Sequence, residues 1–417
     1  MRGAKTRAAS ARLLIALAVA SATWACDGGE GADVFHADTI TFFDVVPDAA
    51  PEAGPDLPAD AVPETGPAHP DALADTAESG LEPALQIALE AAVDAEFAAV
   101  EAPGVQVTVV VPGQGRWSRD QGLADADLGL ALVPGDRFRV GSVTKTFVTA
   151  LILQRVEEGT LALDDPADQW LTGFDFGAGI TLERLLNHTS GLFNYTDDAN
   201  FLGKSTAPAT PTEIIAWARA HGDVFAPGAD WSYSNTGFYV LGLAVEAVAG
   251  EPLAEVLRSR LLAPQGLGDT FFESFEPMPG GRVTGHALGS PVEGLLDMSW
   301  AWAAGGMVSN GDDLCRWAEA LYRGDVLSPA SRAALVAPAA LPGGKFAAYG
   351  LGSYLDTRGG VSVVGHTGST MGFRGEVFIH LASGTCVAVL SNDFFATTRP
   401  MAQAVWSALN ASLALNP

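Results

Sequence analysis

Lysine and cysteine are scarce in this 417-residue chain, which has only four lysines and three cysteines. With so few cysteines, a fold held together mainly by disulfide bonds is excluded. Basic side chains are few overall, with 23 Lys and Arg against 49 Asp and Glu, and the formal net charge is −26. An acidic protein of this kind repels phosphate backbones, so nucleic acids are disfavoured as partners.

Two catalytic signatures are also missing. No serine lies in a G-x-S-x-G sequence, which argues against an α/β-hydrolase. The seven histidines show no H-E-x-x-H or paired spacing, so neither a metal nor another cofactor is expected. The hydrophobic content of 48% is nevertheless enough for a sizeable core, as in a globular enzyme.

The N-terminus has the pattern of an export signal. Residues 1–26 carry four basic side chains and no acidic one, and an apolar run from Leu13 to Ala22 follows the last of them. This run is too short to span a membrane but suits the central segment of a signal peptide. It ends at Cys26 in a loose match to a bacterial lipobox. We therefore expect an exported protein in the periplasm or cell envelope, anchored by a lipid on Cys26, with plain cleavage as the alternative.

Residues 27–80 form a segment of different composition, with thirteen acidic residues, seven prolines and no Lys or Arg. Such a sequence cannot bury enough apolar surface to fold, which predicts a disordered acidic tether. The other two cysteines, Cys315 and Cys386, fall in a helical and a strand pattern. A disulfide between them and two buried free thiols both remain open.

From residue 81 onward, the periodicity predicts one folded domain covering residues 81–417. Strand patterns occur near both ends of this region and helical patterns dominate between about 146 and 345. The fold class is therefore α/β (α+β): an antiparallel sheet from residues 104–140 and 350–395, flanked by helices, with an inserted helical lobe. The expected terminal elements are a helix over 81–100, strands over 105–111, 117–123, 137–140, 361–365, 375–380 and 385–391, and a helix over 401–413.

Ser142 and Lys145 are the residues around which the function is argued. They lie three apart at the start of an apolar helix, so their Cβ atoms should be about 5–6 Å apart on one face. A serine hydroxyl becomes a nucleophile when a neighbouring base takes its proton, and a lysine can be that base if it is held neutral. The alternative is a lysine that extends along the helix to reach water.

A second polar group, Tyr233 and Asn235, comes directly before another apolar helix. Both residues could instead cap that helix. His188 lies in a turn after a short helix, where a histidine is more often a hydrogen-bonded anchor than a catalytic base. His366, Thr367, Gly368 and Ser369 end a predicted strand in small and polar residues, which allow another group to approach the backbone.

Taken together, Ser142-x-x-Lys145, Tyr233-x-Asn235 and His366-Thr367-Gly368 resemble the motifs of the penicillin-recognising serine hydrolases. That family includes class C β-lactamases, DD-carboxypeptidases and related esterases, and the secreted DD-carboxypeptidases are the most similar branch. The resemblance covers about residues 81–415 and implies the β-lactamase/transpeptidase fold.

The resemblance also implies roles for individual residues. Ser142 would form an acyl-enzyme, and Lys145 and Tyr233 would share its proton, with the choice of base left open. Asn235 would hold Lys145 and the substrate amide, and the backbone N–H groups of Ser142 and Ser369 would form the oxyanion hole. His366 would supply a proton or partial positive charge to the substrate, weakly above its own pKa, beside Thr367 and Gly368. Trp300 would form a wall of the cleft, although a core tryptophan is the alternative.

One departure from the family concerns the free carboxylate of a DD-carboxypeptidase substrate, which requires a fixed cation. The branch that this chain resembles has an arginine before the H-T-G motif, and the corresponding position here is Ser353. The nearest substitutes are Arg358, expected in a turn, and Arg374, on the next strand. We therefore expect weak carboxypeptidase activity and better hydrolysis of uncharged esters or amides.

The sequence predicts an exported serine hydrolase, first of all one like a D-alanyl-D-alanine carboxypeptidase, whose substrate is a small molecule or a peptidoglycan peptide. An esterase or a β-lactamase of the same fold is the alternative within the family. An inactive protein that binds cell-wall fragments is the alternative from another class. The intact Ser142, Lys145, Tyr233 and Asn235 argue against it, because a binding protein has no use for an activated nucleophile.

Overall fold

A computed structural model describes residues 80–171, 173–177 and 179–415. The predicted export signal, the lipid site at Cys26 and the acidic tether up to residue 79 lie outside these described residues. Within them, no helix combines the length and the apolar character that crossing a membrane requires.

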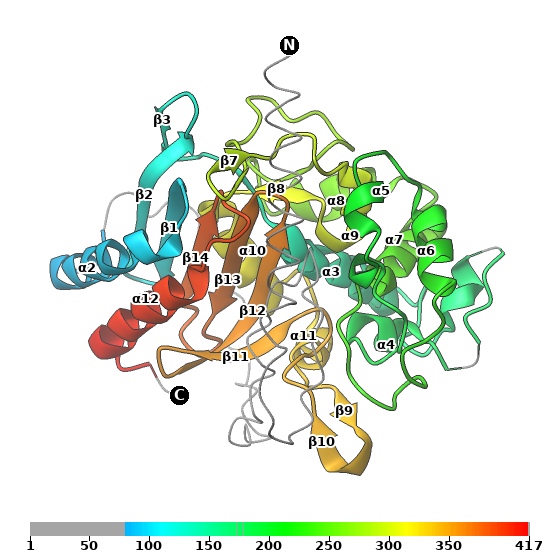
Figure 1. The fold of residues 1–417 in the computed structure, drawn as a ribbon. Helices are drawn as coiled ribbons and strands as arrows, with labels where there is room; N and C mark the ends of the chain where they lie inside the picture. Colours follow the sequence, from blue (N-terminus) through cyan, green and yellow to red (C-terminus); the bar gives the residue numbers. More distant parts are fainter. Residues whose placement is uncertain (1–79, 172, 178, 416–417) are drawn as a thin grey trace, which may run out of the picture.

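The centre of the fold is a seven-stranded sheet in the order β11-β12-β13-β14-β1-β2-β3. All neighbouring strands are antiparallel, and β1 pairs with β14, so the two ends of the domain meet in the middle of the sheet. This arrangement confirms the predicted fold class, and Figure 1 shows the blue and red strands side by side. The strands are β1 (Gly104–Val111), β2 (Gly115–Asp125), β3 (Leu130–Ala131), β11 (Tyr354–Arg358), β12 (Val361–Thr370), β13 (Phe373–Ile379) and β14 (Cys386–Ser391).

One face of the sheet is covered by the first and last helices of the described residues, α2 (Pro83–Val100) and α12 (Thr398–Leu413), which contact each other (Figure 1). The predicted stripe of α2 is buried at Leu85, Leu89 and Val93. These side chains share a core with Val105, Val107 and Val109 of β1, because alternate residues of a strand point to the same face.

The opposite face carries the helical lobe, in which α10 packs on β13 and β14 and the buried helices α3 and α7 contact each other. All residues of α3 from Thr144 to Leu153 are buried, which explains why its sequence is apolar nearly all round. The lobe contains α3 (Thr144–Glu157), α4 (Leu182–Leu186), α5 (Phe201–Lys204), α6 (Pro211–Arg219), α7 (Asn235–Ala249), α8 (Leu253–Leu257), α9 (Trp302–Gly305), α10 (Gly311–Tyr322) and α11 (Pro329–Leu335), with short helical turns η1 (Gly141–Val143), η2 (Ala167–Trp170), η3 (Tyr195–Asp197), η4 (Arg258–Leu262), η5 (Met298–Trp300) and η6 (Pro342–Gly344).

Two details differ from the prediction. The strand predicted over 137–140 is β4 (Phe138–Arg139), which does not join the main sheet but pairs with β8 (Met307–Ser309). β8 also pairs with β5 (Phe271–Phe272), giving a second, three-stranded sheet. The strand predicted to end at residue 365 continues to Thr370, so the His366 motif lies on β12 itself. Two small ribbons complete the fold: β6 (His286–Ala287) with β7 (Ser290–Pro291), and β9 (Ala340–Leu341) with β10 (Lys345–Phe346).

The structure shows whether the two cysteines of the domain form a disulfide or remain free thiols. Cys315 on α10 and Cys386 on β14 are both buried free thiols. Burial raises the pKa of the Cys386 thiol well above its ordinary value, and contact with Cys315 raises it further.

Candidate active site

Ser142 lies where β4 leads into the helical lobe, in η1, and α3 follows without a break. The chain turns at Gly141, whose φ of 49° is in the left-handed region that favours glycine. A Cβ at Gly141 would lie 2.7 Å from the backbone nitrogen and oxygen of Ser369, so a side chain would clash there. Glycine therefore allows Ser142, which is 4% exposed, to lie directly against strand β12.

Lys145 is completely buried one helical turn after Ser142, and its amine is surrounded by oxygen atoms. The Nζ atom is 3.0 Å from Ser142 Oγ, 2.7 Å from Asn235 Oδ1 and 2.7 Å from the Ala304 carbonyl oxygen. These contacts rule out the alternative in which Lys145 extends to solvent.

The types of these three acceptors determine what Lys145 can do. Amide and carbonyl oxygens can only accept hydrogen bonds, so Asn235 and Ala304 each require an N–H from the lysine. An ammonium has one further N–H, which then points at Ser142 Oγ. A neutral amine has only two N–H groups and one lone pair, and that lone pair points at Ser142 instead. The geometry therefore suits Lys145 both as a base for the serine proton and as its carrier.

Asn235 is held in place from the side opposite Lys145. It is the first residue of α7, and its backbone N–H donates to Asn194 Oδ1 at 3.0 Å. Its side-chain Nδ2 donates to Thr196 Oγ1 at 3.3 Å, which orients Oδ1 toward the lysine. Asn194 and Thr196 were not predicted as site residues, because only their spatial proximity to Asn235 reveals their role.

Tyr233 precedes α7 and is 9% exposed. Its ring centroid lies 4.8 Å from Lys145 Nζ, so a charged lysine is attracted to the face of the ring. The structure thus brings Ser142, Lys145, Tyr233 and Asn235 together from two helix starts and one loop.

The third motif lies on the edge of β12 that faces η1. A Cβ at Gly368 would lie 1.9 Å from the Val140 carbonyl oxygen and 3.2 Å from the Ser142 backbone nitrogen. Only a glycine permits this approach of the two backbones. Ser369 is buried beside Gly141, whereas Thr367 is exposed.

His366 is completely buried, and both ring nitrogens contact protein atoms. Nε2 is 2.8 Å from the Tyr349 hydroxyl, and Nδ1 contacts the Thr367 carbonyl oxygen. Burial first, and then the charge of Lys145, lower the pKa of His366 to about 3. A pKa this low favours a neutral His366 at neutral pH and argues against the expected partial positive charge.

His188 is also buried beside the site, and it adopts a left-handed backbone conformation with a φ of 62°. Its Nδ1 accepts a hydrogen bond from the Ser234 backbone N–H at 3.2 Å, and its ring centroid is 4.2 Å from that of Tyr233. Burial, followed by the charge of Lys145, holds the pKa of His188 well below its ordinary value. These are the contacts of a hydrogen-bonded anchor for the Tyr233 loop.

Trp300 is 5% exposed and lies in an aromatic cluster with Tyr195, Phe201 and Trp217. Its indole N–H donates to the Ala207 carbonyl oxygen at 2.7 Å. These are the contacts of a core tryptophan, and a role for Trp300 in binding substrate stays a prediction.

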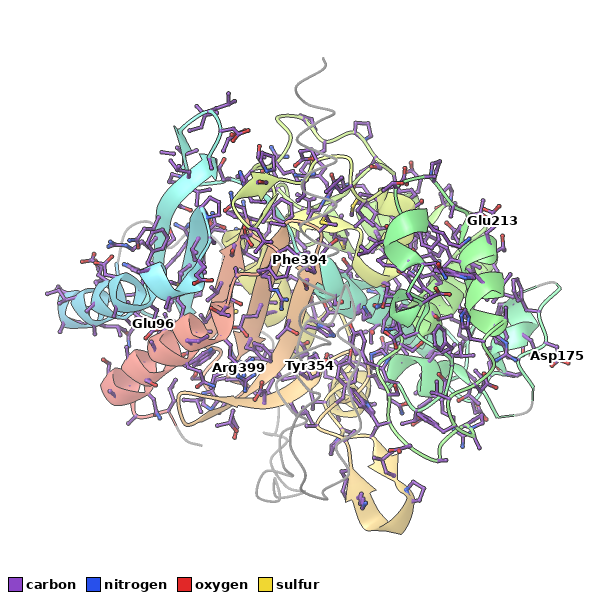
Figure 2. The ribbon with its side chains drawn as sticks, viewed as in Figure 1. Glu96, Asp175, Glu213, Tyr354, Phe394 and Arg399 are labelled. Atoms are coloured by element: carbon purple, nitrogen blue, oxygen red, sulfur yellow. The ribbon has the colours of Figure 1, made fainter. Side chains whose placement is uncertain are left out.

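The residues considered for binding a substrate carboxylate all have partners within the protein. Ser353 is fully buried and bonds the Tyr322 hydroxyl at 2.8 Å. Arg358 is not in a turn but ends β11, where it is fully buried and pairs with Asp356 and, at 2.9 Å, with Glu376. Asp356 also pairs with Arg399 of α12, which is labelled in Figure 2.

Arg358 stacks on Phe378, a residue of the core beneath α2 and α12, so it lies on the face of the sheet opposite α3. Arg374 on β13 donates from Nε to the Phe394 carbonyl oxygen at 2.8 Å and stacks on the Phe394 ring. Arg358 therefore lies away from Ser142, and Arg374 is engaged through its Nε by the Phe394 carbonyl oxygen.

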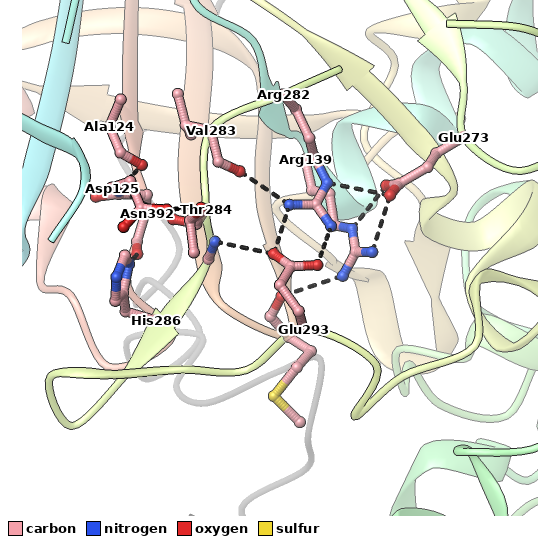
Figure 3. Close-up of polar contacts among 12 residues, drawn as sticks. Ala124, Asp125, Arg139, Glu273, Arg282, Val283, Thr284, His286, Glu293 and Asn392 are labelled. Atoms are coloured by element: carbon pink, nitrogen blue, oxygen red, sulfur yellow. Dashed lines mark hydrogen bonds and ion pairs between the residues drawn. The ribbon is translucent and has the colours of Figure 1, made fainter. Parts of the chain in front are cut away.

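A network of two arginines and two glutamates supports the approach to Ser142 (Figure 3). Arg139 of β4 pairs with Glu273 at 2.6 Å, and Glu273 also pairs with Arg282 at 3.0 Å. Arg282 in turn pairs with Glu293 at 2.9 Å. Arg139 Nη1 also donates to the Met371 carbonyl oxygen at 3.4 Å, which links the chain before Ser142 to the end of β12.

Burial alone would raise the pKa of Glu273, but its hydrogen bonds and attraction to Arg139 and then Arg282 outweigh burial and lower it. The pKa of Glu293 is lowered by Arg282 against burial in the same way. Among the described residues, no group of three or more His, Cys, Asp or Glu side chains is arranged to hold a metal ion.

Comparison with known proteins agrees with this arrangement. A family model described as Beta-lactamase matches residues 89–410. Penicillin-binding protein 4* of Bacillus subtilis is 28% identical over 275 residues, covering 61% of this chain and 60% of that protein. A D-aminopeptidase of Cereibacter sphaeroides is 30% identical over 298 residues, covering 70% of this chain and 57% of that protein. The chain thus spans about 60% of the length of these curated relatives.

Among solved structures, a D-stereospecific amidohydrolase from Streptomyces sp. matches with a TM-score of 0.66 and 32% sequence identity. The match covers 78% of this chain and 98% of the amidohydrolase.

Proposed function

Because the chain belongs to the beta-lactamase family of serine hydrolases, we propose that Ser142 is its nucleophile and forms an acyl-enzyme with an amide or ester substrate. The observation that supports this role best is the set of contacts at Lys145. Asn235 and Ala304 accept hydrogen bonds from Nζ, and Nζ lies 3.0 Å from Ser142 Oγ, within reach of the serine proton.

In the first step, Ser142 Oγ attacks the acyl carbon while its proton passes either to Lys145 or to the adjacent Tyr233. The N–H groups of Ser142 and Ser369 stabilise the oxyanion, a contribution of about 3–4 kcal/mol per donor in related sites. The leaving amine or alcohol takes the proton, and water then attacks the ester carbonyl of the acyl-enzyme to release the acid and regenerate Ser142.

For the substrate class, we propose acyl donors without a free carboxylate on the leaving side. Arg358 is paired with Asp356 and Glu376 on the far face of the sheet, and Arg374 is bound to the Phe394 carbonyl. The similarity to a D-stereospecific amidohydrolase and a D-aminopeptidase further favours an amide with a D-configured acyl residue.

A D-alanyl-D-alanine carboxypeptidase remains the second candidate, and the similarity to penicillin-binding protein 4* supports it. β-Lactamase or simple esterase activity would use the same acyl-enzyme, and an inactive binding protein would form none.

One experiment distinguishes these candidates. The purified chain is given an N-acyl-D-Ala-D-Ala peptide as the free acid and as the C-terminal amide, together with a D-amino acid amide, its L-enantiomer, a short ester and a chromogenic cephalosporin. We expect the uncharged D-configured amides to have the higher kcat/KM. A preference of more than about tenfold, or 1.4 kcal/mol, for the free acid would contradict the proposed substrate class and favour the carboxypeptidase.

The nucleophile is tested separately. After treatment with a fluorophosphonate, peptide mapping should find the adduct on Ser142, and Ser142→Ala should abolish both labelling and turnover. An adduct on another serine, or full turnover by Ser142→Ala, would contradict the proposed mechanism.

We further propose that the protein acts outside the cytoplasm, attached to a membrane by a lipid at Cys26. This rests on the sequence of residues 1–26 alone. Cys26→Ser should move the protein from the membrane fraction to the soluble fraction. An unchanged distribution would argue against the lipid.

A further inference from the structure

Tyr349 is a buried residue beside the candidate active site that no sequence motif indicated. It lies between β10 and β11 and is 1% exposed. Its hydroxyl is 2.8 Å from His366 Nε2, and its ring lies 6.4 Å from that of Tyr233 and 4.7 Å from that of His188, between centroids. Tyr349 therefore bonds His366 of one polar motif and lies beside the ring of Tyr233, which belongs to a second.

The two hydrogen bonds of His366 determine which ring nitrogen carries the proton. The Thr367 carbonyl oxygen beside Nδ1 can only accept, so Nδ1 must be the protonated nitrogen. In a neutral imidazole, Nε2 is then an acceptor, and the Tyr349 hydroxyl must donate to it.

We propose that Tyr349 is a positioning residue of the active site, whose hydroxyl holds His366 as a neutral imidazole in the Nδ1–H tautomer. Both nitrogens of His366 are then engaged by the protein, so this histidine neither protonates the substrate nor attracts a substrate carboxylate. It supports strand β12 and the Tyr233 ring, whose centroid is 6.3 Å from that of His366.

The surroundings explain why a neutral His366 is useful. The titratable groups around it are Lys145 of α3, Tyr233 before α7, Tyr354 of β11 (labelled in Figure 2) and Tyr349 itself, with His188 behind Tyr349. A charged His366 would repel the ammonium form of Lys145 and so change how readily that amine takes and returns the serine proton, whereas a neutral His366 leaves Lys145 unperturbed. The low pKa of His366 is consistent with this arrangement.

The tautomer can be measured directly in the full chain labelled with ¹⁵N-histidine. Long-range ¹H–¹⁵N correlation spectra distinguish Nδ1–H from Nε2–H, and His366→Asn assigns the signal by removing it. We expect His366 to be neutral from pH 5 to 8, with the proton on Nδ1. A proton on Nε2, or a protonated ring at pH 7, would overturn the proposal. This readout does not depend on the proposed function, because it needs no substrate.

The kinetic test uses Tyr349→Phe, which removes only the hydroxyl. We expect kcat to fall by about tenfold, as for one lost buried hydrogen bond, with KM nearly unchanged. The acid limb of the pH profile should move to higher pH, because His366 Nε2 loses its hydrogen-bond donor and accepts a proton more readily. In the His366→Asn background, the same change should have no further effect on kcat.

Tyr322→Phe is the matched control, because it also removes a buried tyrosine hydroxyl with a 2.8 Å partner, Ser353. It should change neither the tautomer of His366 nor the pH profile. Equal pH profiles for Tyr349→Phe and wild type, or an equal kcat loss in the His366→Asn background, would show that Tyr349 does not act through His366. Failure of the proposed function itself would appear differently, as the absence of a Ser142 adduct.

Discussion

Lys145 and Arg139 are buried cations six residues apart in the chain, and they have opposite kinds of partner. The hydrogen-bond partners described for Lys145 are a hydroxyl, a side-chain amide and a backbone carbonyl, and each of these three is uncharged. Arg139 and Arg282 instead share the carboxylate of Glu273, and Arg282 also pairs with Glu293 (Figure 3). A carboxylate favours the charged form of its partner, whereas neutral oxygens leave a lysine able to lose a proton.

The difference separates a catalytic cation from a structural one. An arginine keeps its proton at any physiological pH, and its planar group matches a carboxylate, so it suits a fixed connection between segments. A lysine that must give and take a proton requires partners that orient the amine without fixing its charge. The predictions below change the partners of one group or the other.

The largest effect is expected from Lys145→Met, which removes the amine but keeps an unbranched chain in the apolar helix. Turnover should fall by at least about 10³-fold, since Lys145 takes the serine proton or helps Tyr233 to take it. The melting temperature should change by only a few degrees. Lys345→Met, at an exposed lysine of β10, is the control and should keep full turnover. Substantial activity in Lys145→Met would assign the base to Tyr233 alone.

The next prediction gives Lys145 a carboxylate partner, the kind of partner that Arg139 and Arg282 have. Asn235→Asp would place a carboxylate about where Oδ1 now lies, 2.7 Å from Lys145 Nζ. A hydrogen bond to a charged group contributes about 1.5–3 kcal/mol, so the aspartate should hold the lysine protonated and lower kcat by about 10–100-fold. The pH optimum should also move upward.

Asn187→Asp provides the control for this change, because Asn187 is a buried asparagine that bonds Thr189 and not the lysine. It should keep the wild-type pH profile. An Asn235→Asp protein with unchanged kcat and pH optimum would show that the charge of the partner is not what matters at Lys145.

Much of the fold follows from local patterns in the sequence. The stripe of α2, the short α4 and the hairpin of β1 and β2 lie where periodicity and turn residues placed them. The extent of β12 was underestimated, because His366, Thr367, Gly368 and Ser369 are small or polar and do not alternate like a buried strand. They form a strand because β13 pairs with them and η1 packs on their other edge.

The site was predicted to the extent that its residues belong to motifs. Ser142, Lys145, Tyr233 and Asn235 meet as expected, because helix spacing and helix starts determine their geometry. Tyr349 was missed, since it is an isolated tyrosine whose partners lie at distant positions in the chain. The prediction of Arg358 in a turn was wrong, because a charged residue is expected at the surface. Its burial at the end of β11 depends on Asp356 and Glu376, and no local sequence pattern shows that they pair with it.

The structural group is tested by Glu273→Gln. The change leaves Arg139 and Arg282 buried with one carboxylate fewer, and removing one partner of a buried ion pair costs about 3–5 kcal/mol. We expect a loss of at least about 2–3 kcal/mol in the free energy of unfolding, measured with urea. Folded Glu273→Gln should keep more of its kcat than Asn235→Asp. Unchanged stability would show that this network is not a stabilising one.

The same network predicts a pH dependence of stability. The pKa values of Glu273 and Glu293 are lowered in the folded protein, so both groups stabilise it above their ordinary pKa of 4.5. This contribution should disappear as the pH falls below about 4.5 through the lowered values, because the folded protein then takes up protons less readily than the unfolded chain. Unfolding midpoints in urea at pH 7, 5 and 3.5 should show the decline, and Glu273→Gln should show a smaller one.

The smallest effect is expected from Glu293→Gln, at the outer end of the network. The Glu293 side chain is 50% exposed, against 12% for Glu273, so water screens its attraction to Arg282. The glutamine oxygen can still accept from Arg282 and from the Gly285 backbone N–H, which the glutamate contacts at 3.3 Å. We expect a loss below about 1 kcal/mol, as for other exposed ion pairs. In the double variant with Glu273→Gln the loss should exceed the sum of the two, because Arg282 then has no carboxylate left among the partners described for it. Strict additivity would show that the two glutamates act on Arg282 independently, and the contrast with Lys145 would then rest on Glu273 alone.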